Sequence, residues 1–143
     1  MERQGSRARP RVAGDLLIIE NDARIVELLR WFLERRGHRV RAASSFAQAR
    51  ATIAEHRPDL VLSDIELGGE NARTMLPVLA RAGELPPTLV VSGYLDHDLA
   101  REMLAIPGVV GVLAKPFEFE RLERCIEEQL TRAQPQTIAR SAP

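Results

Sequence analysis

The 143-residue sequence has little cysteine, little lysine, few aromatic residues and no long apolar run. Cys125 is the only cysteine, so an internal disulfide is excluded, and no Cys/His cluster has the spacing of a zinc site. The longest apolar run, residues 106–114, is interrupted by proline and glycine and is far shorter than the ~20 residues of a membrane span. No apolar stretch resembling a signal peptide follows the first arginines. We therefore expect a soluble cytoplasmic chain with no membrane partner.

The sequence also has no net charge, but the two signs are unevenly distributed. Residues 1–14 contain four Arg and one Glu, and residues 131–143 contain two Arg and no acid, which leaves 14 basic and 19 acidic residues between them. An acidic body with short basic ends is unlike a nucleic-acid-binding domain, which gathers Lys and Arg on one face. We expect no nucleic-acid partner, and we expect disordered tails at residues 1–14 and 132–143.

Apolar runs and helical stretches alternate five times along a chain long enough for one domain. The patterns predict strands at residues 16–19, 38–42, 59–63, 88–91 and 109–113, and helices at 22–36, 44–55, 71–82, 96–106 and 118–131. Such alternation predicts an α/β fold over residues 15–131, a doubly wound five-stranded parallel sheet with helices on both faces. Neither a GxGxxG sequence nor a P-loop is present, so a dinucleotide or P-loop site is not expected.

Some side chains are assigned to the core or the surface by periodicity alone. The last helix is expected to bury Leu122, Ile126 and Leu130 and to expose Glu123, Glu127 and Glu128. All three histidines, His38, His56 and His97, are predicted to lie on the surface. Trp31 lies beside the apolar stripe of the first helix, so two interpretations stay open. It either widens the buried face or marks a surface for a partner or a homodimer.

Four of the five predicted strands end in polar side chains, namely Glu20 and Asn21, Asp64, Ser92, and Lys115. In open α/β sheets the carboxyl ends of the strands form the crevice that holds functional groups. The acidic and amide oxygens suit Mg²⁺, the ammonium and the hydroxyl suit phosphoryl oxygens, and Asp64 is a potential nucleophile. Asp and Ser are also common turn formers, so each alone is a weak signal. Lys115 is the only lysine among twenty basic residues, which strengthens the combined signal.

Four segments resemble the receiver domain of bacterial two-component response regulators: Leu-Leu-Ile-Ile-Glu-Asn-Asp at 16–22, Asp-Leu-Val-Leu-Ser-Asp at 59–64, Val-Val-Ser-Gly at 90–93 and Leu-Ala-Lys-Pro-Phe at 113–117. The resemblance spans residues 15–131 and implies a flavodoxin-like strand order 2-1-3-4-5. It implies that Asp64 receives a phosphoryl group from a partner's phosphohistidine, assisted by Ser92 and Lys115. It also implies Mg²⁺ bound by Glu20, Asn21, Asp64 and the backbone carbonyl of Glu66.

The sequence departs from this family pattern at three places. The usual Asp-Asp pair is replaced by Glu20-Asn21, which removes one charge, so we expect weaker Mg²⁺ binding and slower phosphorylation. Val112 stands at the position of the family's switch aromatic, where a small aliphatic side chain cannot swing between two states. The loop at residues 68–71 lacks the family's common Pro-Gly.

The preferred functional hypothesis is a single-domain response regulator that is not itself an enzyme. It is phosphorylated by a histidine kinase or phosphotransfer protein and signals to a downstream protein target, because the residues after the last helix are too few for an output domain. The first alternative is a pseudo-receiver that binds a partner without phosphorylation, as Asn21 and Val112 suggest. A more remote alternative is a haloacid-dehalogenase-type phosphatase, which places a second Asp where this chain has Glu66.

Overall fold

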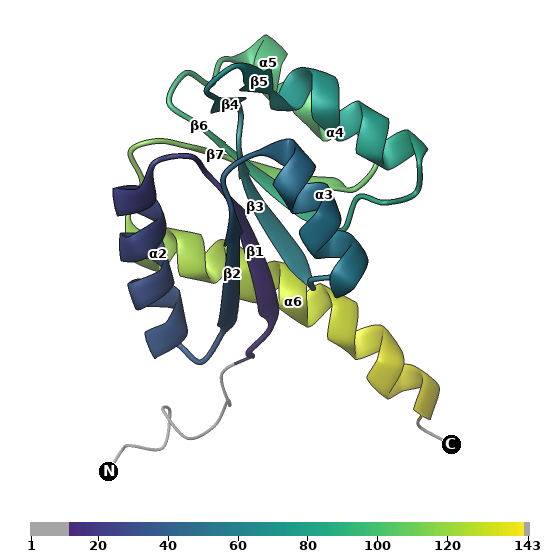
Figure 1. Cartoon of the computed structure of the whole chain (residues 1–143). Coiled ribbons are helices and arrows are strands. Elements are labelled where there is room, and N and C mark those ends of the chain that lie inside the picture. The colour runs from purple at the N-terminus through teal and green to yellow at the C-terminus, as the bar shows by residue number, and fades with distance from the viewer. Residues whose placement is uncertain (1–11, 142–143) are drawn as a thin grey trace.

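A five-stranded parallel sheet lies at the centre of the computed structural model, which describes residues 12–141, with side chains described up to residue 133 (Figure 1). Its strands are β1 (Asp15–Ile19), β2 (Arg39–Ala43), β3 (Leu60–Asp64), β6 (Thr88–Ser92) and β7 (Val109–Ala114). They lie in the order β2-β1-β3-β6-β7, and every neighbouring pair is parallel. This arrangement confirms the expected doubly wound sheet with flavodoxin-like order 2-1-3-4-5.

Helices cover both faces of the sheet. On one face lie α2 (Ala23–Arg35) and α6 (Phe119–Ser141), and on the other lie α3 (Phe46–Glu55), α4 (Ala72–Arg81) and α5 (His97–Leu104) (Figure 1). Four of the helices begin at a side-chain cap that accepts a hydrogen bond from the first turn. The caps are Asp22, Ser45, Asn71 and Asp96. Capping residues satisfy backbone N–H groups that have no partner within the helix.

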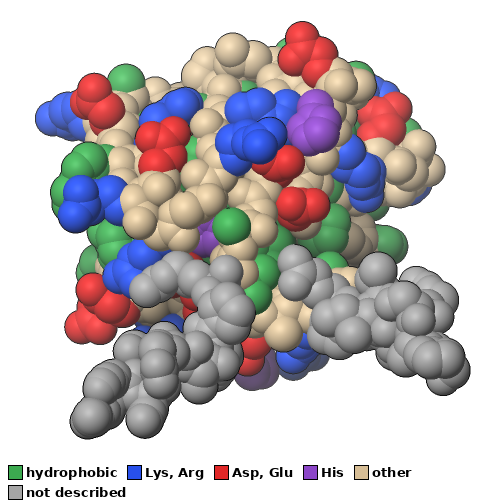
Figure 2. Space-filling view, turned by 90° about the horizontal axis from the view of Figure 1, so that it is seen from below, with side chains coloured by type: hydrophobic (Ala, Val, Ile, Leu, Met, Phe, Trp, Pro, Cys, Tyr) green, Lys and Arg blue, Asp and Glu red, His purple; other side chains and the backbone are tan. Residues whose placement is uncertain are grey.

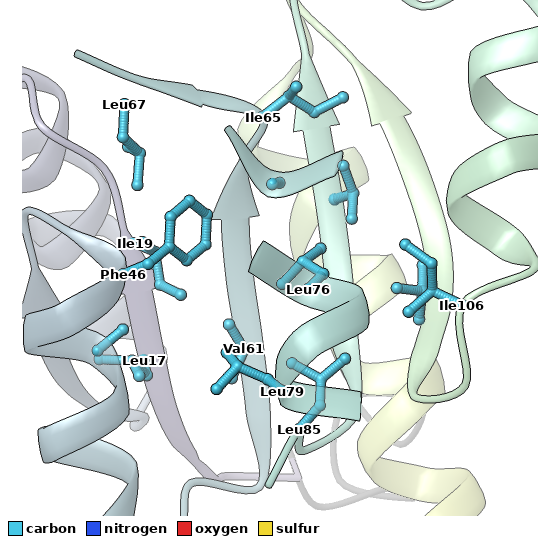
Figure 3. Close-up of a cluster of buried hydrophobic side chains, with 14 of the residues drawn as sticks. Leu17, Ile19, Phe46, Val61, Ile65, Leu67, Leu76, Leu79, Leu85 and Ile106 are labelled. Atoms are coloured by element: carbon cyan, nitrogen blue, oxygen red, sulfur yellow. The ribbon is translucent and has the colours of Figure 1, made fainter. Parts of the chain in front are cut away.

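Alternation along the buried strands divides the core into two layers. Leu16 and Ile18 of β1 pack in the layer under α2 and α6, whereas Leu17 and Ile19 pack in the layer under α3, α4 and α5. Figure 3 shows the second layer, in which Phe46 of α3 lies close to Ile19. Full burial of one such side chain contributes about 1.5–3 kcal/mol, so the two layers fix the strand ends in place.

A short antiparallel hairpin after β3 was not predicted from the sequence. It pairs β4 (Glu66–Leu67) with β5 (Glu70–Asn71) through a turn in which Gly68 has a φ of 54°. This left-handed conformation favours glycine. The Glu70 carboxylate accepts a hydrogen bond of 2.8 Å from the backbone N–H of Phe46, so the hairpin is attached to the start of α3. The hairpin therefore has a defined place beside the end of β3.

The ends of the chain differ in part from the expectation. Residues 1–11 of the expected N-terminal tail lie outside the described residues, whereas Val12 packs against the core. At the other end, α6 continues past the predicted end at Thr131 and reaches Ser141. The expected tail at residues 132–143 thus begins within a helix in this structure.

The surface assignment of His38 and Glu123 was wrong, because both side chains are buried. His38 Nε2 lies 3.1 and 3.2 Å from the two Glu123 carboxylate oxygens, and Nδ1 accepts a hydrogen bond from the Gly14 N–H at 3.2 Å. Because Nδ1 is an acceptor, the imidazole proton belongs on Nε2, where it is donated to the carboxylate. The pair connects α6 to the start of β2, and the hydrogen bonds permit a carboxylate to be buried there.

Charged side chains of both signs share the outer surface. On the face seen in Figure 2, Lys and Arg side chains are interspersed with Asp and Glu. At the start of β1, the Asp15 carboxylate lies 3.5 Å from Arg39 and 3.2 Å from His56. No helix within residues 12–141 is both long enough and apolar enough to cross a bilayer.

Candidate functional site

The ends of the parallel strands bring three charged side chains together. In the sheet register Ile19 of β1 lies beside Ser63 of β3, and Asp64 lies beside Val91 of β6, so the strands end at one edge. Lys115, directly after β7, places its Nζ 3.0 Å from Asp64 Oδ1 and 3.6 Å from Glu20 Oε1. Three residues far apart in the sequence therefore form one cluster of two carboxylates and one ammonium.

Glu20 is the most deeply buried member of the cluster, with 6% of its surface exposed. Its Oε2 accepts a hydrogen bond of 3.0 Å from the backbone N–H of Asp22. Burial raises the pKa of the Glu20 carboxyl, and the neighbouring charge of Asp64 raises it further, while the Asp22 N–H and the Lys115 ammonium act in the opposite direction. Two carboxyl groups thus share one ammonium at this site.

The backbone of Lys115 is hydrogen-bonded to the end of β6. The Lys115 N–H donates a hydrogen bond of 2.8 Å to the carbonyl oxygen of Ser92, which continues the pairing of β6 with β7 by one residue. The peptide bond from Lys115 to Pro116 is cis. The side chain is 28% exposed, so the ammonium is partly desolvated where it meets Asp64.

The Ser92 hydroxyl is buried at the end of β6 but is directed to its own loop. It donates a hydrogen bond of 2.9 Å to the carbonyl oxygen of Tyr94 and accepts one of 3.0 Å from the Tyr94 N–H. Ser92 is therefore at the expected strand end, next to Lys115 through the backbone, with its hydroxyl engaged in a turn. The Tyr94 side chain itself is exposed to solvent.

Asn21 and Glu66 are the other two residues expected at the metal, Glu66 through its backbone carbonyl. Both side chains are exposed. Asn21 faces the β4–β5 turn. A Cβ placed on Gly68 would lie 3.5 Å from the side-chain amide nitrogen of Asn21. Lys115 thus contacts Glu20 and Asp64, whereas metal binding by Asn21 and by the Glu66 carbonyl stays a prediction.

The donor set at this edge fits Mg²⁺ rather than a softer metal. The described residues contain no group of three or more His, Cys, Asp or Glu that could hold a metal ion by themselves. Mg²⁺ usually keeps several waters and takes one or two carboxylates, and Glu20 and Asp64 supply two that share one ammonium. Neutral oxygens from Asn21 and from the Glu66 backbone are the remaining candidates.

A mainly apolar cavity of about 480 Å³ opens beside the charged cluster. It extends from Asp64 and Lys115 to Leu28 of α2 and to Phe117 and Phe119 before and at the start of α6. The cluster is therefore accessible from the side of α2. Cavities of this kind commonly surround a few convergent polar groups at functional sites.

The chain belongs to the response regulator receiver domain family, whose model matches residues 16–127. Apart from Asp15 at the start of β1, the match includes the five strands of the parallel sheet and the three charged residues of the cluster. Receiver domains are phosphoacceptors of two-component systems, and they generally bind Mg²⁺ at the phosphorylation site. The family also implies interaction with histidine kinases or phosphotransfer proteins.

Individual relatives agree with this assignment. The chain is 34% identical over 116 residues to the transcriptional regulatory protein MalR of Bacillus subtilis, covering 80% of this chain and 49% of MalR. NtrX from Brucella abortus matches with a TM-score of 0.79 and 25% identity over 90% of this chain and 30% of that chain. The BeF3-activated receiver domain of RstA from Klebsiella pneumoniae shares the fold, with a TM-score of 0.73, 22% identity and coverage of 81% and 97%. The chain thus spans about half, or less, of the length of its full-length relatives.

Two polar contacts around the site were not predicted from the sequence. The first is the turn that engages the Ser92 hydroxyl, for which Ser92 followed by Gly93 was the only local signal. The second is the hairpin against Asn21, which the two glycines at 68 and 69 could have indicated.

Proposed function

We propose that this receiver domain accepts a phosphoryl group on the carboxylate of Asp64 from the phosphohistidine of a histidine kinase or phosphotransfer protein. The observation that supports this most directly is the position of Lys115 Nζ, 3.0 Å from Asp64 Oδ1 and 3.6 Å from Glu20 Oε1. An ammonium held beside a partly exposed carboxylate can neutralise a phosphoryl group that arrives on that carboxylate.

In the proposed transfer, an Asp64 oxygen attacks phosphorus and forms a P–O bond. The P–N bond of the donor phosphohistidine breaks, and its electron pair remains on the imidazole nitrogen. Lys115 stabilises the negative charge on the phosphoryl oxygens through its ammonium. Mg²⁺, when bound, supplies further positive charge at the same oxygens. Glu20 and Asp64 would hold the metal, together with the Asn21 amide oxygen and the Glu66 carbonyl.

The Ser92 hydroxyl contributes only after it rotates. In this structure its proton is donated to the Tyr94 carbonyl, so donation to a phosphoryl oxygen requires loss of that hydrogen bond. A neutral hydrogen bond contributes about 0.5–1.5 kcal/mol net, so a charged phosphoryl acceptor can compensate for the loss. We assign Ser92 to this role as part of the proposal.

The signal then passes to a downstream protein, and the chain acts in the cytoplasm, where two-component phosphotransfer takes place. The stand-alone arrangement remains an expectation from the sequence, since the relatives are mostly longer proteins. A second candidate function is a pseudo-receiver that binds its target without phosphorylation. It is favoured by Asn21 in the acidic pair and by half-buried Val112 at the position of the switch aromatic.

The two functions are separated by incubation with Mg²⁺ and acetyl phosphate, followed by intact-mass measurement. The phosphoacceptor hypothesis predicts a gain of one phosphoryl group in the wild type and none in Asp64→Asn. Asp98→Asn, an equivalent change at an exposed position of α5, is the matched control and should gain the group normally. An unmodified wild type under conditions that modify a known receiver would support the pseudo-receiver instead. Turnover of a phosphate ester would indicate a phosphatase.

A further inference from the structure

The β4–β5 hairpin, which follows Asp64 after one residue, is held in place by three contacts. The Ala72 N–H donates a hydrogen bond of 2.7 Å to the Ile65 carbonyl oxygen across the base of the hairpin. The Leu67 side chain is buried in the core layer under α3, α4 and α5 (Figure 3). The carboxylate of half-buried Glu70 accepts a hydrogen bond of 2.8 Å at the start of α3. The hairpin is therefore attached to the core and to a neighbouring helix.

The register of the hairpin determines the direction of the Glu66 carbonyl. Hydrogen bonding in an antiparallel ladder alternates from one residue to the next. Ile65 bonds across the hairpin to Ala72, and the next residue, Glu66, is paired in register with Asn71. Glu66 therefore turns its backbone carbonyl away from β5. This carbonyl is the one expected to bind Mg²⁺, so its availability depends on the hairpin keeping its register and its place.

One short segment, residues 43–46, is bonded both to the acidic pair and to the hairpin. The Glu20 N–H donates a hydrogen bond of 3.0 Å to the Ala43 carbonyl oxygen. Three residues further on, the Phe46 N–H donates its hydrogen bond of 2.8 Å to the Glu70 carboxylate. The end of β1 and the hairpin are thus fixed to the same few residues between β2 and α3. The Glu70 contact is the side-chain contact that completes this connection.

The Glu70 carboxylate also suits the position that it occupies. Phe46 is the first residue of α3, so its N–H has no partner within the helix. The N-cap residue Ser45 accepts its hydrogen bond from Gln48 instead. A helix N-terminus carries a partial positive charge, which favours a carboxylate there. Loss of the Glu70 side chain would therefore leave a buried N–H without its acceptor and would release one attachment of the hairpin.

We propose that Glu70 is a positioning residue for Mg²⁺. Its hydrogen bond to the start of α3 holds the hairpin so that the Glu66 carbonyl can join the two carboxylates of the charged cluster at one metal ion. The inference rests on the Mg²⁺ site of the proposed function and names a residue outside the expected ligands that sets the affinity of this site. Residues that orient metal ligands commonly change metal affinity 10- to 100-fold when they are replaced.

Positioning matters more in this chain because its acidic pair is Glu20-Asn21. The Asn21 amide contributes no formal charge, so electrostatic attraction supplies less of the Mg²⁺ affinity than two acids would supply. A neutral carbonyl then makes a larger relative contribution, and that contribution is greatest when the carbonyl is already in place. Pre-organised ligands avoid the entropy cost of ordering a loop on binding.

The first test measures the Mg²⁺ dissociation constant of the full chain by titration calorimetry, without phosphodonor. We expect Glu70→Ala to raise this constant about tenfold. Glu70→Gln removes the same charge but keeps an acceptor for the Phe46 N–H, so it should raise the constant less than about threefold. Glu55→Ala, which removes a carboxylate from the exposed end of α3, is the matched control and should leave the constant unchanged. Equal effects of Glu70→Ala and Glu70→Gln would assign the effect to charge alone and would overturn the proposal.

The second test perturbs the same hairpin without changing any charge. Gly68 has a φ of 54°, so Gly68→Ala places a strained residue in the turn. We expect this variant to raise the Mg²⁺ dissociation constant about threefold. Gly93→Ala is the matched control, because a Cβ at Gly93 meets no atom within 4 Å and its φ is not in the left-handed region. Wild-type affinity in Gly68→Ala would contradict the dependence of the metal site on the hairpin. Circular dichroism checks that every variant folds.

A third measurement separates positioning from general stability. Amide hydrogen exchange without Mg²⁺ should be faster at residues 66–71 in Glu70→Ala than in the wild type, with the sheet strands unchanged. Equal exchange in the two proteins would show that Glu70 does not hold the hairpin and would overturn the proposal.

The outcomes also separate this inference from the proposed phosphorylation. A wild type that binds Mg²⁺, with unchanged affinity in Glu70→Ala, refutes the role of Glu70 alone. A wild type that binds no Mg²⁺ overturns the inference together with the metal site. Phosphorylation of Asp64 is measured separately, by the mass gain with acetyl phosphate, and its failure leaves the calorimetric result for Glu70 unaffected.

Discussion

Replacing Lys115 by methionine tests the electrostatic design of the site without requiring any phosphodonor. The variant keeps a side chain of similar length but removes the ammonium that lies between Asp64 and Glu20. The two carboxylates then remain close together without a compensating charge. We expect the free energy of unfolding at pH 7 to fall.

The magnitude follows from the hydrogen bond and from its exposure. A hydrogen bond to a charged group contributes about 1.5–3 kcal/mol when it is well desolvated. Lys115 is 28% exposed and its partners are more buried, so the value lies between that of a surface ion pair and that of a buried one. We therefore expect Lys115→Met to destabilise the fold by about 2 kcal/mol at pH 7 in the absence of divalent cations.

The pH dependence of this loss has a defined sign. Lys115 lowers the pKa of the Glu20 carboxyl against the effect of burial, so its removal raises that pKa further. A carboxyl with a raised pKa in the folded state disfavours folding only when it is ionised. The difference between variant and wild type should thus be largest at pH 7 and shrink as the pH falls through the Glu20 pKa.

Urea denaturation at several pH values measures this difference directly. Arg81→Met, which removes a positive charge from an exposed position of α4, is the matched control and should change stability by less than about 0.5 kcal/mol. Adding Mg²⁺ should recover part of the lost stability in Lys115→Met, because the metal can lie between the same carboxylates. A Lys115→Met variant as stable as the wild type at pH 7, or a loss independent of pH, would refute the reasoning.

Three further predictions concern single side chains. Glu20→Gln should be more stable than the wild type near pH 7 and no more stable near pH 4. Because the pKa of Glu20 is raised in the folded state, the contribution of Glu20 to stability is present at low pH and is lost as the pH rises. Denaturation over a pH series measures this difference. Asn21→Asp should tighten Mg²⁺ binding about tenfold, measured by calorimetry, because it restores a carboxylate next to Glu20. His38→Leu should lower the free energy of unfolding in urea by about 3 kcal/mol, because it leaves the buried Glu123 carboxylate without its hydrogen-bond donor. The double variant His38→Leu with Glu123→Leu should recover much of that loss.

The sheet and the strand ends could be predicted because the signals are local. A window of a few positions shows each continuous apolar run, such as residues 16–19, and the polar residue that ends it. The parallel arrangement then follows from the alternation of strands with helices, and it requires the polar ends to meet at one edge. Glu20, Asp64 and Lys115 were located correctly as neighbours for this reason.

The features that were missed depend on contacts between distant segments. His38 and Glu123 are 85 residues apart, and each has a typical surface residue type, so only the packing of α6 against the start of β2 shows that they are buried together. Trp31 is 58% exposed, so the interpretation that it widens the buried face of α2 is wrong. Its exposure likewise depends on how far α2 is rotated against the sheet. Helical periodicity places Trp31 beside the apolar stripe but does not decide which side of the boundary it occupies.

The most direct test of the central claim is a crystal structure of the chain with Mg²⁺ and beryllofluoride, an analogue of a carboxylate-bound phosphoryl group. We expect the analogue on an Asp64 oxygen, with Lys115 Nζ and Ser92 Oγ both within hydrogen-bond distance of its fluorines and Mg²⁺ beside Glu20. An analogue absent from Asp64, or present with the Lys115 amine turned away from it, would contradict the assignment of these strand ends as one phosphoryl site.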